Sequence, residues 1–124
     1  MKLICKYEKF LNGYGPYCKS FNDNQSEEFL AEYLADSDIR LAKHALEKLE
    51  DRNIINDFVG SEGWDADIMG DKVMIELSNT NYEDKVYIDR KIVAYAVSRW
   101  LKFLERDMDI NYEEIIDTED MYKE

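Results

Sequence analysis

The carboxylates Asp65, Asp67 and Glu76 have a spacing similar to that of the ligands in a calcium-binding loop. They match positions 1, 3 and 12 of an EF-hand calcium loop, and Gly70 stands at position 6, where such a loop turns. Met69, however, occupies position 5, which needs an oxygen ligand, and two glycines precede the loop where a helix must run. The segment also alternates between apolar and polar residues, as a β-hairpin does. We therefore predict that these carboxylates bind no calcium and face solvent from a hairpin.

The residues that could act as a base or a nucleophile are His44, Cys5 and Cys18. His44 lies among lysines in an expected helix, where a surface position is the simplest interpretation. With a turn centred near residue 13 or 14, Cys18 lies opposite Lys9, so we predict two free structural thiols and no bridge to Cys5. A cysteine–histidine dyad is left open by the sequence, but no motif positions one. We expect no catalytic residue, no metal and no other cofactor.

Acidic residues interleaved with aromatic residues indicate a protein-binding surface more strongly than any residue above indicates catalysis. The chain contains nine Tyr and two Trp, residue types that bury a large area at protein interfaces with little loss of side-chain entropy. Both features meet in residues 64–71 and 111–120. We expect the partner-binding residues to be Trp64, Asp65, Asp67, Asp71, Tyr112, Glu113, Glu114, Asp117, Glu119 and Asp120.

The net charge of −12 is distributed unevenly along the 124 residues. Residues 22–84 carry a net charge of −12 and residues 105–124 carry −7, whereas residues 1–21 and 85–104 are basic, at +3 and +4. A field of this sign attracts a basic partner and repels nucleic acids and anionic membranes. We therefore expect a basic protein partner, without direct binding of nucleic acid or membrane.

The first half of the chain predicts a hairpin followed by helical structure. Residues 2–10 alternate as a strand, and after a glycine-rich turn residues 17–21 return as a second strand. Asn24, followed three residues later by Glu27, indicates a helix start. A second apolar stripe at helical spacing covers residues 39–51, and the pattern leaves open whether there are two helices or one kinked helix.

The second half contains the clearest hairpin. Residues 64–77 alternate on both sides of the turn Gly70-Asp71, and residues 85–88 provide a further edge strand. We predict an α+β fold, in which two β-hairpins form an antiparallel sheet and the helices pack mainly on one face.

A long amphipathic helix ends the predicted core. It covers about 90–106, with Asp89 as its N-cap. Its apolar stripe consists of Val93, Val97, Trp100, Leu101 and Leu104. We predict that residues 1–106 form a single domain and that residues 107–124 are an acidic tail, either docked or mobile. No apolar run approaches the length of a membrane span, the N-terminus has no signal-peptide pattern, and two cysteines are too few for a disulfide scaffold, so we expect a cytoplasmic protein.

In size, charge and aromatic–acidic interleaving, the chain resembles the small acidic immunity proteins of bacterial contact-dependent inhibition and related polymorphic-toxin systems. The segments WDAD at 64–67 and NYEE at 111–114 show the interleaving. The resemblance implies a stoichiometric inhibitor that binds a cognate toxin, often a basic nuclease, and blocks its active site or an adjacent surface. Two alternatives stay open: an acidic mimic of nucleic acid that inhibits a DNA- or RNA-binding protein, and a small enzyme with an unrecognised site.

Overall fold

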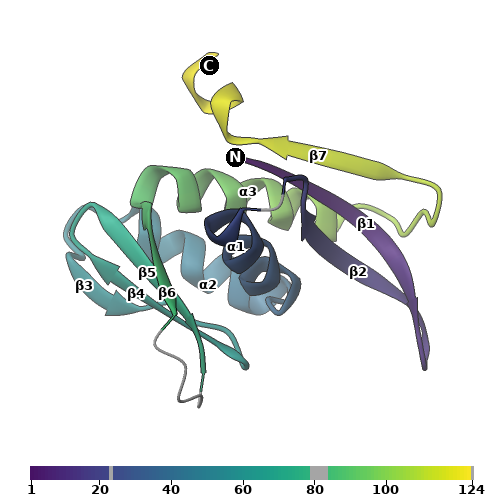
Figure 1. Ribbon diagram of the computed structural model, residues 1–124, viewed down its shortest axis with the longest axis horizontal. Helices are drawn as coiled ribbons and strands as arrows, with labels where there is room; N and C mark the ends of the chain where they lie inside the picture. Colours follow the sequence, from purple (N-terminus) through teal and green to yellow (C-terminus); the bar gives the residue numbers. More distant parts are fainter. Residues whose placement is uncertain (23, 79–83, 124) are drawn as a thin grey trace.

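The computed structural model describes residues 1–22, 24–78 and 84–123. In this part of the chain, helices lie between two antiparallel sheets (Figure 1). The elements in chain order are β1 (Lys2–Phe10), β2 (Gly13–Ser20), α1 (Gln25–Ala35), α2 (Ile39–Glu50), β3 (Asn56–Phe58), β4 (Trp64–Met69), β5 (Lys72–Leu77), β6 (Lys85–Asp89), α3 (Arg90–Glu105), β7 (Glu113–Asp117) and the 3-10 helix η1 (Thr118–Lys123).

The prediction of an α+β fold is confirmed, but the two hairpins do not share one sheet. The strand orders are β2-β1-β7 and β3-β4-β5-β6, so each hairpin belongs to a sheet of its own. Helices α1 and α3 contact strands of both sheets and form the middle layer between them. Each hairpin has one apolar face to bury, and a shared helical layer covers both faces at once.

The first hairpin has a different register from the predicted one. It turns at residues 11–12, and the next residue, Gly13, adopts a φ of 114°, a value that favours glycine. This early turn places Cys18 directly opposite Cys5, so the prediction that Cys18 faces Lys9 is wrong. Both thiols are free and buried. A hydrogen bond with Cys5, together with burial, raises the pKa of the Cys18 thiol well above its usual value.

Two separate helices, each with its own N-cap, follow this hairpin. The predicted Asn24 cap of α1 is confirmed, because its side chain accepts a hydrogen bond from the Glu27 backbone N–H at 3.2 Å. Asp38 caps α2 in the same way, accepting from the backbone N–H of Leu41 at 2.8 Å. The chain between the helices leaves helical geometry at Asp38, which is why one kinked helix does not form.

The Glu27 side chain ties the start of α1 to the first sheet. It is only 5% exposed, and its carboxylate accepts hydrogen bonds from Ser20 Oγ at 3.0 Å, the Asn22 backbone N–H at 3.1 Å and the Lys2 backbone N–H at 3.2 Å. Burial alone raises the pKa of this carboxyl, but the hydrogen bonds from Asn22, Lys2 and Ser20 outweigh burial and lower it.

Helix α3 provides the largest buried side chain. Trp100 is fully buried, and its indole N–H donates to the Ser37 carbonyl oxygen at 2.9 Å. Val93 and Val97 of the predicted stripe are also buried, whereas Leu101 and Leu104 are only partly buried. Asp89 stands at the N-cap as predicted, but its side chain makes no capping hydrogen bond and instead forms an ion pair with Lys72.

Part of the acidic C-terminal segment is built into the first sheet. Strand β7 pairs antiparallel with β1, and Ile116 is buried between this sheet and the helices. The Thr118 backbone N–H then donates to the Met1 carbonyl oxygen at 2.9 Å. In the described ranges, no helix has the length and apolar character that a membrane crossing requires.

Replacing Trp100 with Ala should lower the free energy of unfolding by about 3–5 kcal/mol, because a large buried ring is lost. Urea denaturation followed by circular dichroism measures this change. Leu11→Ala is the control: Leu11 is fully exposed in the first turn, so its truncation should change stability by less than about 0.5 kcal/mol. A loss below about 1 kcal/mol for Trp100→Ala would contradict the buried position.

Replacing Glu27 with Gln should destabilise the protein at neutral pH by about 1–3 kcal/mol, because a charged acceptor of several hydrogen bonds is lost. Since the pKa of Glu27 is lowered on folding, its stabilisation is complete above the unfolded pKa of about 4.3 and disappears as the pH falls through the folded pKa. The unfolding free energies of the two proteins should therefore converge at acidic pH. Urea titrations across the pH range test this, with the exposed neighbour Glu28→Gln as the control. A difference that is independent of pH would refute the assignment.

Candidate protein-binding surface

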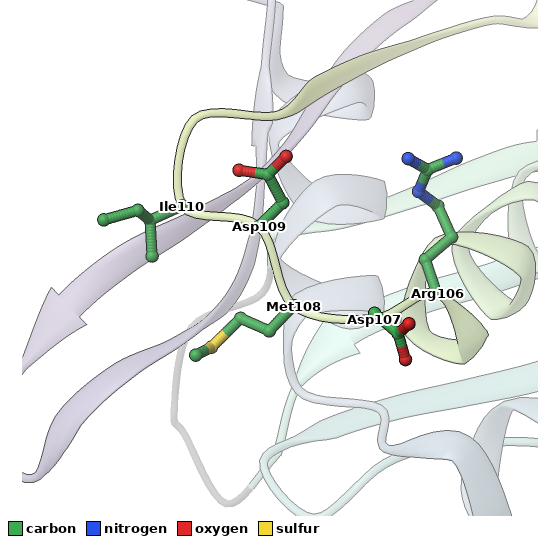
Figure 2. A pocket seen from close by; sticks show the side chains of 5 residues that line it. All are labelled: Arg106, Asp107, Met108, Asp109 and Ile110. Carbon is green, nitrogen blue, oxygen red and sulfur yellow. The ribbon is translucent and has the colours of Figure 1, made fainter.

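Two concave regions on the surface could in principle hold a ligand. One is an open hollow of about 740 Å³ over residues 106–110, whose side chains point in different directions (Figure 2). The other is a groove of about 930 Å³ between the end of α2 and the start of α3, which includes Asp71 and Tyr122. In the residues that the structure describes, no three His, Cys, Asp or Glu side chains converge in a way that could hold a metal ion. His44 is exposed on α2.

The two aromatic residues predicted to bind a partner pack against other rings. Trp64 is partly buried and lies edge-on to Phe29, with ring centroids 5.1 Å apart. Tyr112 stacks on Phe103 at 6.2 Å, and the guanidinium of Arg106 lies 3.8 Å from the Tyr112 ring centroid. Most of the contact area of both rings is therefore used inside the fold.

The predicted acidic residues of the C-terminal segment fall on different surfaces. Glu114 faces the helices and forms an ion pair with Arg99 at 2.9 Å, and this hydrogen bond raises the pKa of the guanidinium. Glu113 and Asp117 lie on the other face of β7, because side chains alternate along a strand. The last two predicted acids, Glu119 and Asp120, lie in η1.

The predicted acids of β4, in contrast, share one surface. Asp65 and Asp67 alternate with the buried Ala66 and Ile68, so they point away from the helices. We call this surface the outer sheet face, and it is the side of β3-β4-β5-β6 opposite the helical layer (Figure 1). Residues paired across antiparallel strands lie on the same face, and the strand registers therefore assign to it Asn56, Phe58, Asp65, Asp67, Met69, Lys72, Met74, Glu76, Lys85, Tyr87 and Asp89.

A continuous row crosses the middle of the outer sheet face. Phe58 pairs with Asp67, Asp67 with Met74, and Met74 with Tyr87. The rings at the two ends are 48% and 53% exposed, whereas Met74 in the centre is only 7% exposed. Exposed rings around a covered methionine, with a carboxylate between them, combine apolar contact area with negative charge.

Acidic and basic residues lie on both sides of this row. On one side Asp65 pairs with Glu76, and the Asp65 carboxylate accepts a hydrogen bond from Ser78 Oγ at 2.6 Å. On the other side Lys72 forms an ion pair with Asp89. The predicted residue Asp71 is exposed in the β4–β5 turn, beyond the end of this sheet face.

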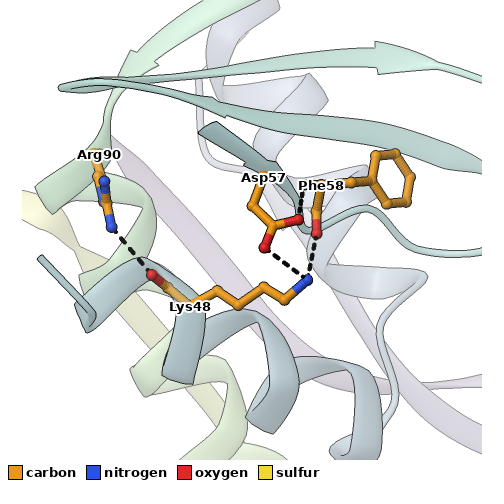
Figure 3. Close-up of polar contacts among 4 residues, drawn as sticks. All are labelled: Lys48, Asp57, Phe58 and Arg90. Carbon is orange, nitrogen blue, oxygen red and sulfur yellow. Dashed lines mark hydrogen bonds and ion pairs between the residues drawn. The ribbon is translucent and has the colours of Figure 1, made fainter. Parts of the chain in front are cut away.

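Polar contacts of α2 and α3 with β3 and with the β4–β5 turn help to hold the outer sheet face in place. The Arg90 guanidinium donates five hydrogen bonds of 2.6–3.3 Å to backbone carbonyl oxygens at the end of α2, in the following loop and in the β4–β5 turn. Lys48 lies 3.2 Å from both the Asp57 carboxylate and the Phe58 carbonyl oxygen (Figure 3). The five acceptors of the Arg90 hydrogen bonds are the carbonyl oxygens of Lys48, Leu49, Asp51, Ile54 and Gly70.

Sequence reasoning missed the apolar members of the row. Phe58, Met74 and Tyr87 were not among the predicted partner-binding residues, although the predicted turn at Gly70-Asp71 already places Met74 opposite Asp67. The alternation of β5 also assigned Met74 to the polar side of the hairpin. An apolar residue such as Met74 on the otherwise polar face of a strand could have indicated this surface from the sequence.

Comparison with known proteins assigns the chain to a family. A model described as a family of unknown function (DUF5376) matches residues 1–122. The chain belongs to this family. Three relatives of this DUF5376 chain come from Pasteurella multocida (strain Pm70). UPF0275 protein PM0493 is 33% identical over 98% of this chain and 99% of its own length. UPF0275 protein PM0489 is 32% identical over 98% of this chain and 99% of its own length. UPF0275 protein PM0504 is 30% identical over 98% of this chain and 97% of its own length. No solved structure matches.

The carboxylates Asp65, Asp67 and Glu76 should not respond to calcium, because they project from extended strands of a hairpin and not from a loop between two helices. Thermal melts in millimolar calcium and in chelator should give the same midpoint. A rise of several degrees in calcium that the Asp67→Asn variant abolishes would show that these carboxylates hold the ion.

Proposed function

We propose that this protein is a stoichiometric inhibitor of the immunity type, which binds and neutralises a basic toxin domain through the outer sheet face. The observation that carries the proposal is the row Phe58–Asp67–Met74–Tyr87 on the side of the sheet opposite the helices. Exposed aromatic rings beside acidic groups fit a partner that presents apolar surface among lysine and arginine side chains.

The proposed mechanism has two stages. The net charge of −12 steers a basic domain toward the acidic surface, which accelerates association at low ionic strength. The Phe58 and Tyr87 rings, on either side of the covered Met74, then lose their solvent exposure against the partner. Asp65 and Asp67 at the centre receive basic side chains of the partner and fix its orientation.

The surface is preorganised for such binding. Core residues of β4 and β5 anchor its strands to the helices, and Arg90 ties its β4–β5 turn to the end of α2. A surface that is already ordered loses little conformational entropy on association, so more of the contact energy appears as affinity.

The relatives also fit this proposal. One bacterial strain contains several full-length relatives, and each of the three described above is about a third identical to this chain. A family of inhibitors that keep a scaffold and diverge in partner specificity would produce several such proteins in one cell.

Capture of partners from the source cell, with identification by mass spectrometry, should recover a basic protein. Tyr87→Ala should then raise its dissociation rate and weaken binding by about 2 kcal/mol or more, because an aromatic ring buried on binding is lost. Asp67→Lys should lower the association rate, most strongly at low salt. Surface plasmon resonance at several salt concentrations separates the two effects.

Tyr14→Ala is the matched control, because Tyr14 is 49% exposed but lies on β2 in the other sheet. If Tyr14→Ala and Tyr87→Ala weaken binding equally, the outer sheet face is not the interface. Inhibition should also saturate near one equivalent of protein per toxin. Complete loss of toxin activity at a small fraction of an equivalent would indicate an enzyme and refute stoichiometric inhibition.

A further inference from the structure

Strand β7 ends the sheet β2-β1-β7, so one of its two edges has no neighbouring strand among the described residues. The Thr118 backbone N–H bonds to the Met1 carbonyl oxygen. Since bonding alternates along an antiparallel strand, Glu114 and Ile116 bond to β1, and the N–H and C=O groups of Glu113, Ile115 and Asp117 point away from it. These groups form a row of donors and acceptors that an added strand could pair with.

The pairing that β7 already makes with β1 shows which sequence fits it. Lys2 lies opposite Asp117, Ile4 opposite Ile115, and Lys6 opposite Glu113. The alternate positions of β1 are thus basic, apolar and basic. They match the acidic, apolar and acidic positions on this face of β7. Opposite charges and apolar pairs across strands are the stabilising combinations.

A second copy of this chain fits the free edge poorly. An antiparallel β7–β7 pair centred on Ile115 would place Glu113 of each copy opposite Asp117 of the other, and like charges directly opposite each other destabilise a sheet. The same repulsion does not apply to a basic segment. The charge pattern of β7 therefore discourages self-association and selects for a basic strand.

The other long edges differ from β7. On β2, Pro16 faces Tyr7 and has no N–H to donate, and α1 packs beside this strand. On β6 the exposed positions carry opposite charges, at Lys85 and Asp89. Neither edge combines free backbone donors with charge of one sign.

We propose that the free edge of β7 binds an extended basic segment of a partner protein as a fourth strand of the sheet β2-β1-β7. The segment has basic side chains opposite Glu113 and Asp117 and an apolar side chain opposite Ile115. The backbone hydrogen bonds supply affinity, and the side-chain pattern supplies specificity. This site lies on the other sheet from the outer sheet face, so each proposal can be tested without the other.

The test uses the full chain and the capped peptide acetyl-Lys-Thr-Ile-Thr-Lys-amide, which follows the β1 pattern. On titration, the backbone amide NMR signals of Glu113, Ile115 and Asp117 should shift, and their hydrogen exchange should slow. A peptide with an N-methyl group on the central Ile keeps every side chain but loses a backbone donor, so it should lose binding. Replacing both Lys with Glu should also abolish binding.

The Ile115→Pro variant removes an outward N–H of β7 without removing a bond to β1, and it should lose peptide binding while Ile115→Ala retains it. A thermal melt checks that both variants fold, and the N-methyl peptide decides the question if the proline variant does not. Equal binding of the methylated peptide, or shifts confined to other acidic surfaces, would show charge attraction alone and overturn the proposal. Glu47→Lys, at an exposed position of α2 outside both proposed surfaces, should leave peptide binding unchanged.

Discussion

The guanidinium of Arg90 is the contact on which the arrangement of the second sheet depends. Its donors meet backbone carbonyl oxygens at the end of α2, in the loop that follows it and in the β4–β5 turn. The last carbonyls of a helix have no partner within the helix and carry partial negative charge. A planar cation with five donors satisfies several of them at once, which a lysine ammonium cannot do with the same geometry. One side chain thus links the start of α3 to the end of α2 and to the β4–β5 turn, in addition to the core packing.

Glu27 has the corresponding role in the first sheet. Its carboxylate collects donors from the start of β1 and the end of β2, while its own backbone N–H completes the cap of α1. In both cases a charged side chain bonds mainly to backbone or neutral groups and not to an opposite charge. Such bonds join elements distant in sequence without the desolvation of a second ion. The helical layer is thus attached to one sheet through an acid and to the other through a base.

The local structure could be predicted from the sequence, and its assembly could not. Alternation around Gly70-Asp71 and the cap at Asn24 depend only on neighbouring residues, and both appear as predicted. The first turn was expected near residue 13 or 14, but the chain turns at residues 11–12, and this difference moves Cys18 opposite Cys5. Residues 113–117 were too few and too acidic to indicate a strand, since their partner lies at the opposite end of the chain. The same limit applied to the candidate surface: its acids on β4 were predicted, but the apolar row depends on pairing between three strands.

The position of β1 in the middle of its sheet has a consequence for synthesis of the protein. One neighbour, β2, follows within a few residues, but the other, β7, is translated more than a hundred residues later. Until then, the β7-facing edge of β1 lacks its partner, and Leu3 has no Ile116 beside it. Pairings between distant residues form slowly because a long loop must close first. The nascent chain can therefore complete its second sheet and its helices before the first sheet is complete. During this time β1 exposes an edge to chaperones and to other nascent chains on the same polysome.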